Sequence, residues 1–270
     1  PPPVGYCSGD PLVRHSCHTG LIAMHIIDAY CGVGPWASRD PLLPDSIDAT
    51  ITIMDHYGVA EAFVFHNLRW IYESAGAING RTSELVRAEP RFRPAFMIEL
   101  HPHATPVSGY FDAMRAADAR LAWLCPVRFG HTLAPWQIGE FAECAVQHQL
   151  PVMLAMDGVS AADVDGLASA FPKLRLILAG VGYRDDVWLY PLFKRHHELH
   201  LCLAPAYVPP LAPERFVNAF GSGRLLFGSG LPFSTPGGLL SMVAHARISD
   251  TDRDAIFAGT ADRLSKEVIW

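Results

Sequence analysis

Short runs of apolar residues alternate with helix-like segments from residue 26 to the C-terminus. Most of these runs are continuous rather than alternating, which is typical of strands that are buried on both faces of a parallel sheet. The pattern therefore predicts eight strands, at residues 26–29, 62–65, 94–100, 121–127, 151–156, 174–179, 199–204 and 224–228.

The segments between the apolar runs have helical spacing and recognisable ends. Ser46 is placed to cap a helix that stops at Gly58, because a serine side chain can accept a hydrogen bond from a backbone N–H of the first turn. Ser160 is placed in the same way before a helix that stops ahead of Pro172. Two further helices are predicted at residues 73–90 and 135–149.

Eight strands, each followed by a helix, predict an α/β fold of the (β/α)8 TIM-barrel type in a single domain over residues 24–270. A doubly wound open sheet is the alternative, and it usually carries a glycine-rich phosphate turn after its first strand. Here Gly32 and Gly34 form only G-x-G, followed by Pro35 and Trp36 where the helix would open, so the barrel is favoured.

The first 23 residues show no periodicity, no basic start and no apolar stretch of signal-peptide length. The first predicted strand begins almost directly after Met24. We interpret residues 1–23 as a non-native or disordered extension and Met24 as the natural start.

Composition narrows the function classes. The chain has 21 basic and 27 acidic residues and a formal net charge of −6, which argues against binding to nucleic acids or to anionic membranes. No apolar run approaches the ~20 residues of a membrane span. The six cysteines show no close pairing, so we expect buried thiols and a cytoplasmic protein. A homo-oligomer is a separate possibility that the sequence leaves open.

In such a barrel the chemistry is placed at the C-terminal ends of the strands. His66, His131 and Asp157 follow predicted strands, and we expect them to be the candidates for acid–base catalysis, because imidazole titrates near neutral pH. The candidates for binding a small, anionic ligand are Tyr30, Trp36, Arg39, Glu99, His101, Arg128, Tyr183 and Ser229.

Each candidate also has a structural interpretation. Arg128 can clamp a carboxylate with two hydrogen bonds, or it can form an ion pair across the barrel. His66 and His131 can equally be buried histidines whose hydrogen bonds are satisfied by the fold. His101 and His103 have the spacing of a metal pair, but a catalytic site needs a third ligand, and none is evident.

The chain resembles the amidohydrolase-related TIM-barrel proteins in five segments that occur in the family's order. Residues 27–34 (IDAYCGVG) resemble the opening motif I-D-x-H-x-H-x-G, and residues 224–232 (RLLFGSGLP) resemble the eighth-strand motif R-L-L-F-G-S-D-x-P. The three other segments are similar to the fifth strand, the sixth strand and the final helix, at residues 150–154, 171–179 and 256–264.

The resemblance implies a metal site that this sequence lacks. The family's ligands are two histidines on strand one, one on strand five, one on strand six and an aspartate on strand eight. The matching positions are Tyr30, Gly32, Ala155, Gly180 and Gly230. Glycine and alanine have no donor atom and tyrosine is an uncommon ligand, so we expect no bound metal and no other cofactor.

Two functions follow from these observations. The family includes hydrolases, lactonases and decarboxylases of small carboxylated or cyclic compounds, so the resemblance implies a hydrolase or carbon–carbon lyase. The missing ligands imply that its pocket is metal-free. The alternative is a catalytically inactive barrel that binds a ligand or serves as a scaffold, because fold alone does not determine function.

Overall fold

The continuous apolar runs of the chain form one parallel sheet. The computed structural model describes residues 24–35, 42–70, 74–101, 103 and 105–270, and the predicted extension at residues 1–23 lies outside them. Within the described residues the eight strands are hydrogen-bonded to their sequence neighbours in the order β1 to β8. The strands are β1 (Ile27–Val33), β2 (Glu61–His66), β3 (Phe92–Ile98), β4 (Leu121–Leu124), β5 (Val152–Ala155), β6 (Leu176–Ala179), β7 (Leu199–Leu203) and β8 (Leu225–Phe227).

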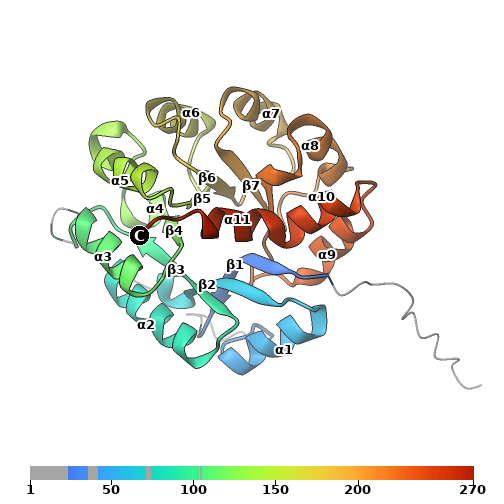
Figure 1. Cartoon of the computed structure of the whole chain (residues 1–270), viewed down its shortest axis with the longest axis horizontal. Coiled ribbons are helices and arrows are strands. Elements are labelled where there is room, and N and C mark those ends of the chain that lie inside the picture. The colour runs from blue at the N-terminus through green and yellow to red at the C-terminus, as the bar shows by residue number, and fades with distance from the viewer. Residues whose placement is uncertain (1–23, 36–41, 71–73, 102, 104) are drawn as a thin grey trace, which may run out of the picture.

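Helices surround this sheet and give the (β/α)8 barrel that the sequence predicts (Figure 1). The helices are α1 (Ile47–Tyr57), α2 (Ala75–Ala88), α3 (Val107–Ala116), α4 (Pro126–Phe129), α5 (Pro135–Gln147), α6 (Ala161–Ala170), α7 (Asp186–Arg195), α8 (Ala212–Phe220), α9 (Pro236–Ala244), α10 (Asp250–Asp254) and α11 (Thr260–Lys266). Short helical turns lie at η1 (Asn67–Trp70), η2 (Ser222–Arg224) and η3 (Ala255–Gly259).

The helix boundaries show why these segments fold as the sequence predicts. The Oγ atom of Ser46 accepts a hydrogen bond from the backbone of α1, and Gly58 ends the helix in the left-handed conformation at φ 70°. Ser160 caps α6 in a reciprocal arrangement with Asp163. Helix α2 is shorter than predicted, because Ser74 is its N-cap.

The fourth strand is also shorter than predicted. It ends at Leu124, because Pro126 begins the short helix α4 and Gly130 ends that helix in the left-handed conformation at φ 67°. This turn carries Arg128 away from the end of the strand and leads the chain directly to His131.

The barrel closes between β1 and β8 through a few specific contacts. The backbone of Gly32 donates a hydrogen bond to Leu231, and Gly230 donates one to Tyr30. Helix α11 lies across the opposite, N-terminal end of the strands (Figure 1), where Arg263 of that helix donates to the carbonyl of Gly223. Because α11 covers the N-terminal end, the C-terminal end of the barrel is the one available for a functional site.

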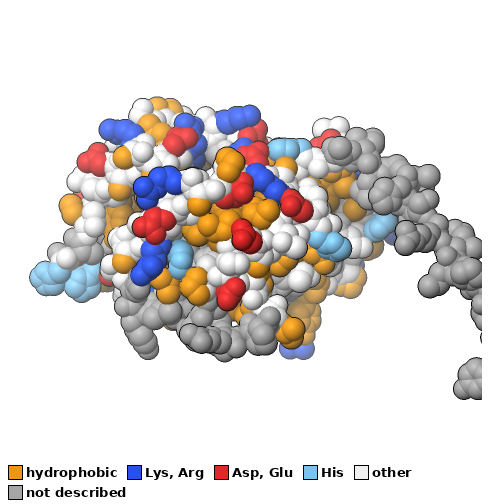
Figure 2. All heavy atoms as spheres, turned by 90° about the horizontal axis from the view of Figure 1, so that it is seen from below, with side chains coloured by type: hydrophobic (Ala, Val, Ile, Leu, Met, Phe, Trp, Pro, Cys, Tyr) orange, Lys and Arg blue, Asp and Glu red, His pale blue; other side chains and the backbone are white. Residues whose placement is uncertain are grey.

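One face of the molecule is mixed in charge. Figure 2 shows one side wall, on which acidic, basic and apolar side chains are interspersed without a large field of one sign. In the described part of the chain, no helix has both the length and the apolar character that crossing a bilayer requires.

Candidate functional site

The C-terminal ends of β2, β3 and β4 carry three titratable side chains. His66 is the last residue of β2, Glu99 follows β3, and His131 follows the short helix after β4. Both histidines are buried, while Glu99 is half-buried. Neighbouring strands thus place two of the predicted acid–base residues and one predicted ligand-binding residue at the same end of the barrel.

His66 is held by the backbone on both sides. Its Nδ1 atom accepts a hydrogen bond from the backbone N–H of Leu68 at 3.1 Å, so the proton of the neutral ring is on Nε2. The Nε2 edge packs against Gly34, where an added Cβ would lie only 2.7 Å from Nε2. Gly34 has φ 93°, which together with this close approach favours glycine at the position.

His131 links the ends of β3 and β4. Its Nε2 atom accepts a hydrogen bond from the backbone N–H of Leu100 at 2.8 Å. Burial lowers the pKa of His131, the charge of Glu99 opposes this shift, and His101 adds to it. The Glu99 carboxylate in turn accepts a hydrogen bond from the backbone N–H of Ala75 at 3.0 Å, at the start of α2.

Ser229 lies in the closure of the barrel rather than on its rim. It is fully buried, and its backbone N–H donates to Oδ1 of Asp28 at 2.8 Å. The same carboxylate oxygen accepts a hydrogen bond from the backbone of Tyr30 at 2.9 Å. Burial raises the pKa of Asp28 to about 6, although these hydrogen bonds favour its ionised form.

Tyr30 points into the barrel. Its ring centroid lies 4.9 Å from that of Trp123 on β4 and 5.8 Å from that of Phe65 on β2. Phe65 and Trp123 are themselves 5.3 Å apart. These three rings form an aromatic cluster that fills the inside of the barrel.

The remaining predicted residues lie on α4, on loops, or outside the described residues. Arg128 is half-buried on α4, with its guanidinium 5.2 Å from the ring centroid of Phe129. Asp157, Tyr183 and His101 are exposed on their loops. Trp36 and Arg39 lie outside the described residues.

Sequence reasoning missed Asn67 and the role of Asp28. Asn67 is fully buried, and its amide donates to the carbonyl of Gly34 at 2.8 Å, which fixes the end of β1. A signal was present for Asp28, because a single aspartate within an apolar strand must find hydrogen-bond donors when it is buried. Asn67 carries no comparable signal, since asparagine is common in loops.

A family model described as amidohydrolase matches residues 45–264. The chain belongs to the amidohydrolase family. No protein of curated function shows significant sequence similarity to it.

Solved structures of similar fold cover nearly the whole of this chain. A 5-carboxyvanillate decarboxylase from Sphingomonas paucimobilis has a TM-score of 0.73 and 12% identity, with 91% of this chain and 100% of that chain covered. A dihydroxybenzoic acid decarboxylase from a Polaromonas species, with bound manganese and the inhibitor 2-nitroresorcinol, has a TM-score of 0.67 and 16% identity, with 90% and 97% covered. A candidate 2-pyrone-4,6-dicarboxylic acid hydrolase from Pseudomonas putida has a TM-score of 0.67 and 16% identity, with 92% and 99% covered. At these identities the likeness is one of fold.

The residues of this chain do not fit a divalent metal at the positions that the resemblance assigns to the family's ligands. Within the described residues, no three His, Cys, Asp or Glu side chains are grouped closely enough to hold a metal ion. At Gly32 an added Cβ would lie 2.2 Å from Oδ1 of Asn67, so a ligating side chain has no room there. Gly230 has φ 72° and an added Cβ would lie 3.0 Å from Pro205, which also disfavours a longer side chain.

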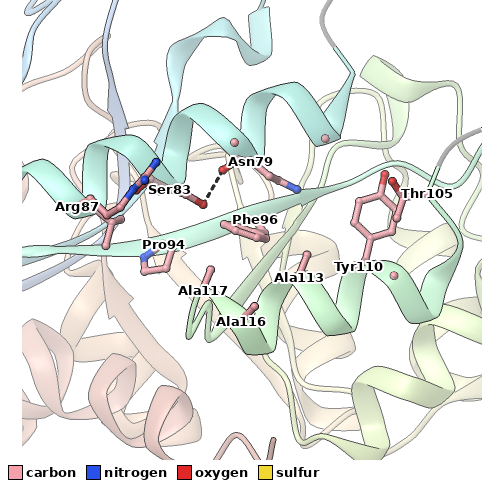
Figure 3. A pocket seen from close by; sticks show the side chains of 14 residues that line it. Asn79, Ser83, Arg87, Pro94, Phe96, Thr105, Tyr110, Ala113, Ala116 and Ala117 are labelled. Atoms are coloured by element: carbon pink, nitrogen blue, oxygen red, sulfur yellow. Dashed lines mark hydrogen bonds between the residues drawn. The ribbon is translucent and has the colours of Figure 1, made fainter.

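A cavity of about 620 Å³ lies on the outer wall of the barrel rather than at the mouth. It runs between α2 and α3, over Pro94 and Phe96 of β3 (Figure 3). Six of its fourteen lining residues are glycine or alanine, and Arg87 lies at one end and Tyr110 at the other (Figure 3). The residues that line this cavity include no His, Asp or Glu that could serve in acid–base catalysis, so we place the candidate site at the mouth.

Proposed function

We propose that this amidohydrolase-family chain acts on a small carboxylated or cyclic compound at the C-terminal end of its barrel, as a hydrolase or decarboxylase that uses no divalent metal ion. The observation that carries the proposal is the grouping of Glu99 and His131 at adjacent strand ends, in a barrel whose metal-ligand positions hold no suitable donors. The similar folds that act on carboxylated rings support this choice of substrate class.

The two histidines are suited to bind and orient a substrate. In each ring one nitrogen accepts a backbone hydrogen bond, from Leu68 at His66 and from Leu100 at His131. The other nitrogen of each neutral ring then carries a proton and is a hydrogen-bond donor. Arg128 lies on α4, the one-turn helix between β4 and His131, and its guanidinium is suited to hold the carboxylate of the ligand.

A panel of carboxylates tests this function by calorimetry and by product analysis. We expect 2,6-dihydroxybenzoate or 2-pyrone-4,6-dicarboxylate to bind and to be converted. We expect Arg128→Ala to weaken binding about tenfold or more, as loss of a charge-assisted hydrogen bond does. Arg184→Ala is the matched control, because Arg184 is exposed on another loop. Equal binding by Arg128→Ala and the wild type would remove Arg128 from the site.

A non-catalytic binding protein is the second candidate. The observation in its favour is the close packing of Asn67 against Gly32, which fills a position that the family uses for chemistry. Binding of a carboxylate without any turnover, in protein that is fully folded, would favour this second function over the first.

A further inference from the structure

The cavity between α2 and α3 has the size of a small-molecule site. Its volume of about 620 Å³ lies within the range of roughly 300–1,000 Å³ that is typical of ligand pockets. The lining residues of α2 run from Gly76 to Arg87, and the helical rise of about 1.5 Å per residue gives this stretch a length of about 16 Å. A cavity of this volume and length is narrow, so it suits a chain-like ligand better than a broad one.

The floor and one side of the cavity are apolar. Pro94 and Phe96 of β3 form the floor between the two helices, and both residues are buried (Figure 3). The α3 side consists of the short side chains of Ala113, Ala116 and Ala117 (Figure 3). Covering apolar surface of this kind with an alkyl chain is favourable, because it removes both surfaces from water.

Two glycines of α2 leave the helix backbone bare on the cavity side. An added Cβ at Gly80 would meet no atom within 4 Å, and one at Gly76 would meet only Oγ of Ser74, at 4.0 Å. Neither glycine has a positive φ. Glycine inside a helix is destabilising relative to alanine. The described residues therefore give no reason for glycine at either position, whereas a ligand that lies against the helix backbone does.

The two ends of the cavity differ in charge. At one end Arg87 is exposed, its Nε donates to the carbonyl of Ser83 at 3.2 Å, and it forms no ion pair with a described residue. At the other end, burial together with the charge of Glu99 raises the pKa of Tyr110. An anionic head group is therefore attracted to the Arg87 end and repelled from the Tyr110 end, which fixes the direction in which a ligand would lie.

We propose that this cavity is a second binding site for a straight-chain carboxylate such as decanoate, with the carboxylate at Arg87 and the alkyl chain along β3 between the two helices. The terminal nitrogens of the guanidinium supply the charged donors that a carboxylate needs. The cavity lies on the outer wall, and its lining includes none of His66, Glu99 and His131. The inference therefore does not depend on the function proposed for the mouth.

Isothermal titration calorimetry with decanoate tests the inference in the whole chain. We expect Gly80→Leu to weaken decanoate binding about tenfold or more, because the leucine side chain takes the space beside the helix. The higher helix propensity of leucine keeps α2 folded in this variant. Gly166→Leu is the matched control, because Gly166 lies in α6, does not line the cavity, and an added Cβ there also meets no atom within 4 Å. This control should bind decanoate as the wild type does.

A neutral ligand of the same chain length tests the charged end of the cavity. We expect Arg87→Gln to weaken decanoate binding about tenfold, as the loss of a charge-assisted hydrogen bond does, and to leave the binding of decan-1-ol unchanged. Arg128→Ala should leave decanoate binding unchanged, which separates this cavity from the mouth.

Hydrogen-exchange mass spectrometry locates the ligand without a substitution. We expect decanoate to slow amide exchange in α2 and α3 of the wild type. No binding of decanoate to the wild type, equal affinity in Gly80→Leu and the wild type, or a loss of affinity in Arg128→Ala would overturn this inference. Each of these results leaves the proposed function standing, because that function concerns the mouth.

Discussion

Two buried histidines at opposite ends of the barrel use their polar atoms differently. His200, at the start of β7, is 3% exposed, and its Nδ1 atom lies 3.1 Å from the carbonyl of Glu198. His131, at the C-terminal end, is 9% exposed and has a donor that no described residue accepts. Burial lowers the pKa of both rings.

The surroundings of His200 show what a purely structural polar network looks like. Arg224 donates hydrogen bonds to the carbonyls of Leu199, Phe193 and His196. Arg175 donates to Gln149 in the same manner. At this end these polar groups are satisfied by the protein itself, whereas Nδ1 of His131 at the mouth has no hydrogen-bond partner among the described residues. The difference supports placing the function at the C-terminal end.

Arg224→Ala should have the largest effect on stability. The substitution leaves three partly buried carbonyls without a donor and removes a guanidinium that lies 4.5 Å from the ring centroid of Phe193. We expect a loss of about 3–5 kcal/mol in the free energy of unfolding, measured by urea denaturation. Arg224→Lys keeps the positive charge but lacks the forked guanidinium, so its stability should lie between those of the wild type and Arg224→Ala. A loss below 1 kcal/mol in Arg224→Ala would contradict the view that this end is structural.

Asp28→Ala should have the next largest effect, because it removes the acceptor of two buried N–H groups at the closure of the barrel. We expect a loss of about 2–4 kcal/mol in the free energy of unfolding at pH 5, measured by urea denaturation. Asp28→Asn keeps an acceptor oxygen and should lose less. If Asn and Ala at this position were equally destabilising, the two hydrogen bonds would not be the cause.

His200 makes stability depend on pH in the acid range. Burial, together with Arg263, Arg224 and Arg175, lowers the pKa of this histidine to about 3, against 6.5 in an unfolded chain. Between these two pKa values the unfolded chain binds more protons than the folded chain. The stability that His200 contributes is therefore complete above pH 6.5 and is lost as the pH falls toward 3. In this range the free energy of unfolding should change by up to about 1.4 kcal/mol per pH unit because of His200.

The variant His200→Gln isolates this contribution. Asp28, whose pKa is raised to about 6, gives the opposite dependence of stability on pH. This effect is present in both proteins, so it cancels when the free energy of unfolding of the variant is subtracted from that of the wild type at each pH. The difference between the two proteins should shrink as the pH falls below 6.5. A difference that stays constant from pH 7 to pH 4 would show that His200 does not titrate in this way.

The sequence predicts the barrel well because doubly buried strands leave a continuous apolar pattern. The mouth is harder to predict. The orientation of His131 depends on Gly130 and on a helix of one turn, which periodicity cannot detect, although Pro126 and Gly130 are the start and stop signals of such a turn. Likewise, the burial of Ser229 depends on Asp28, which is distant in sequence. Such details come from tertiary contacts rather than from local pattern.

The most direct test of the account is the effect of metal on ligand binding. Calorimetry with 2,6-dihydroxybenzoate compares protein treated with EDTA, the same protein after addition of Mn²⁺, and the untreated protein. We predict the same affinity in all three samples, because no three ligating side chains of the described residues are grouped for a metal ion. Binding that is lost with EDTA and restored by Mn²⁺ would contradict the account.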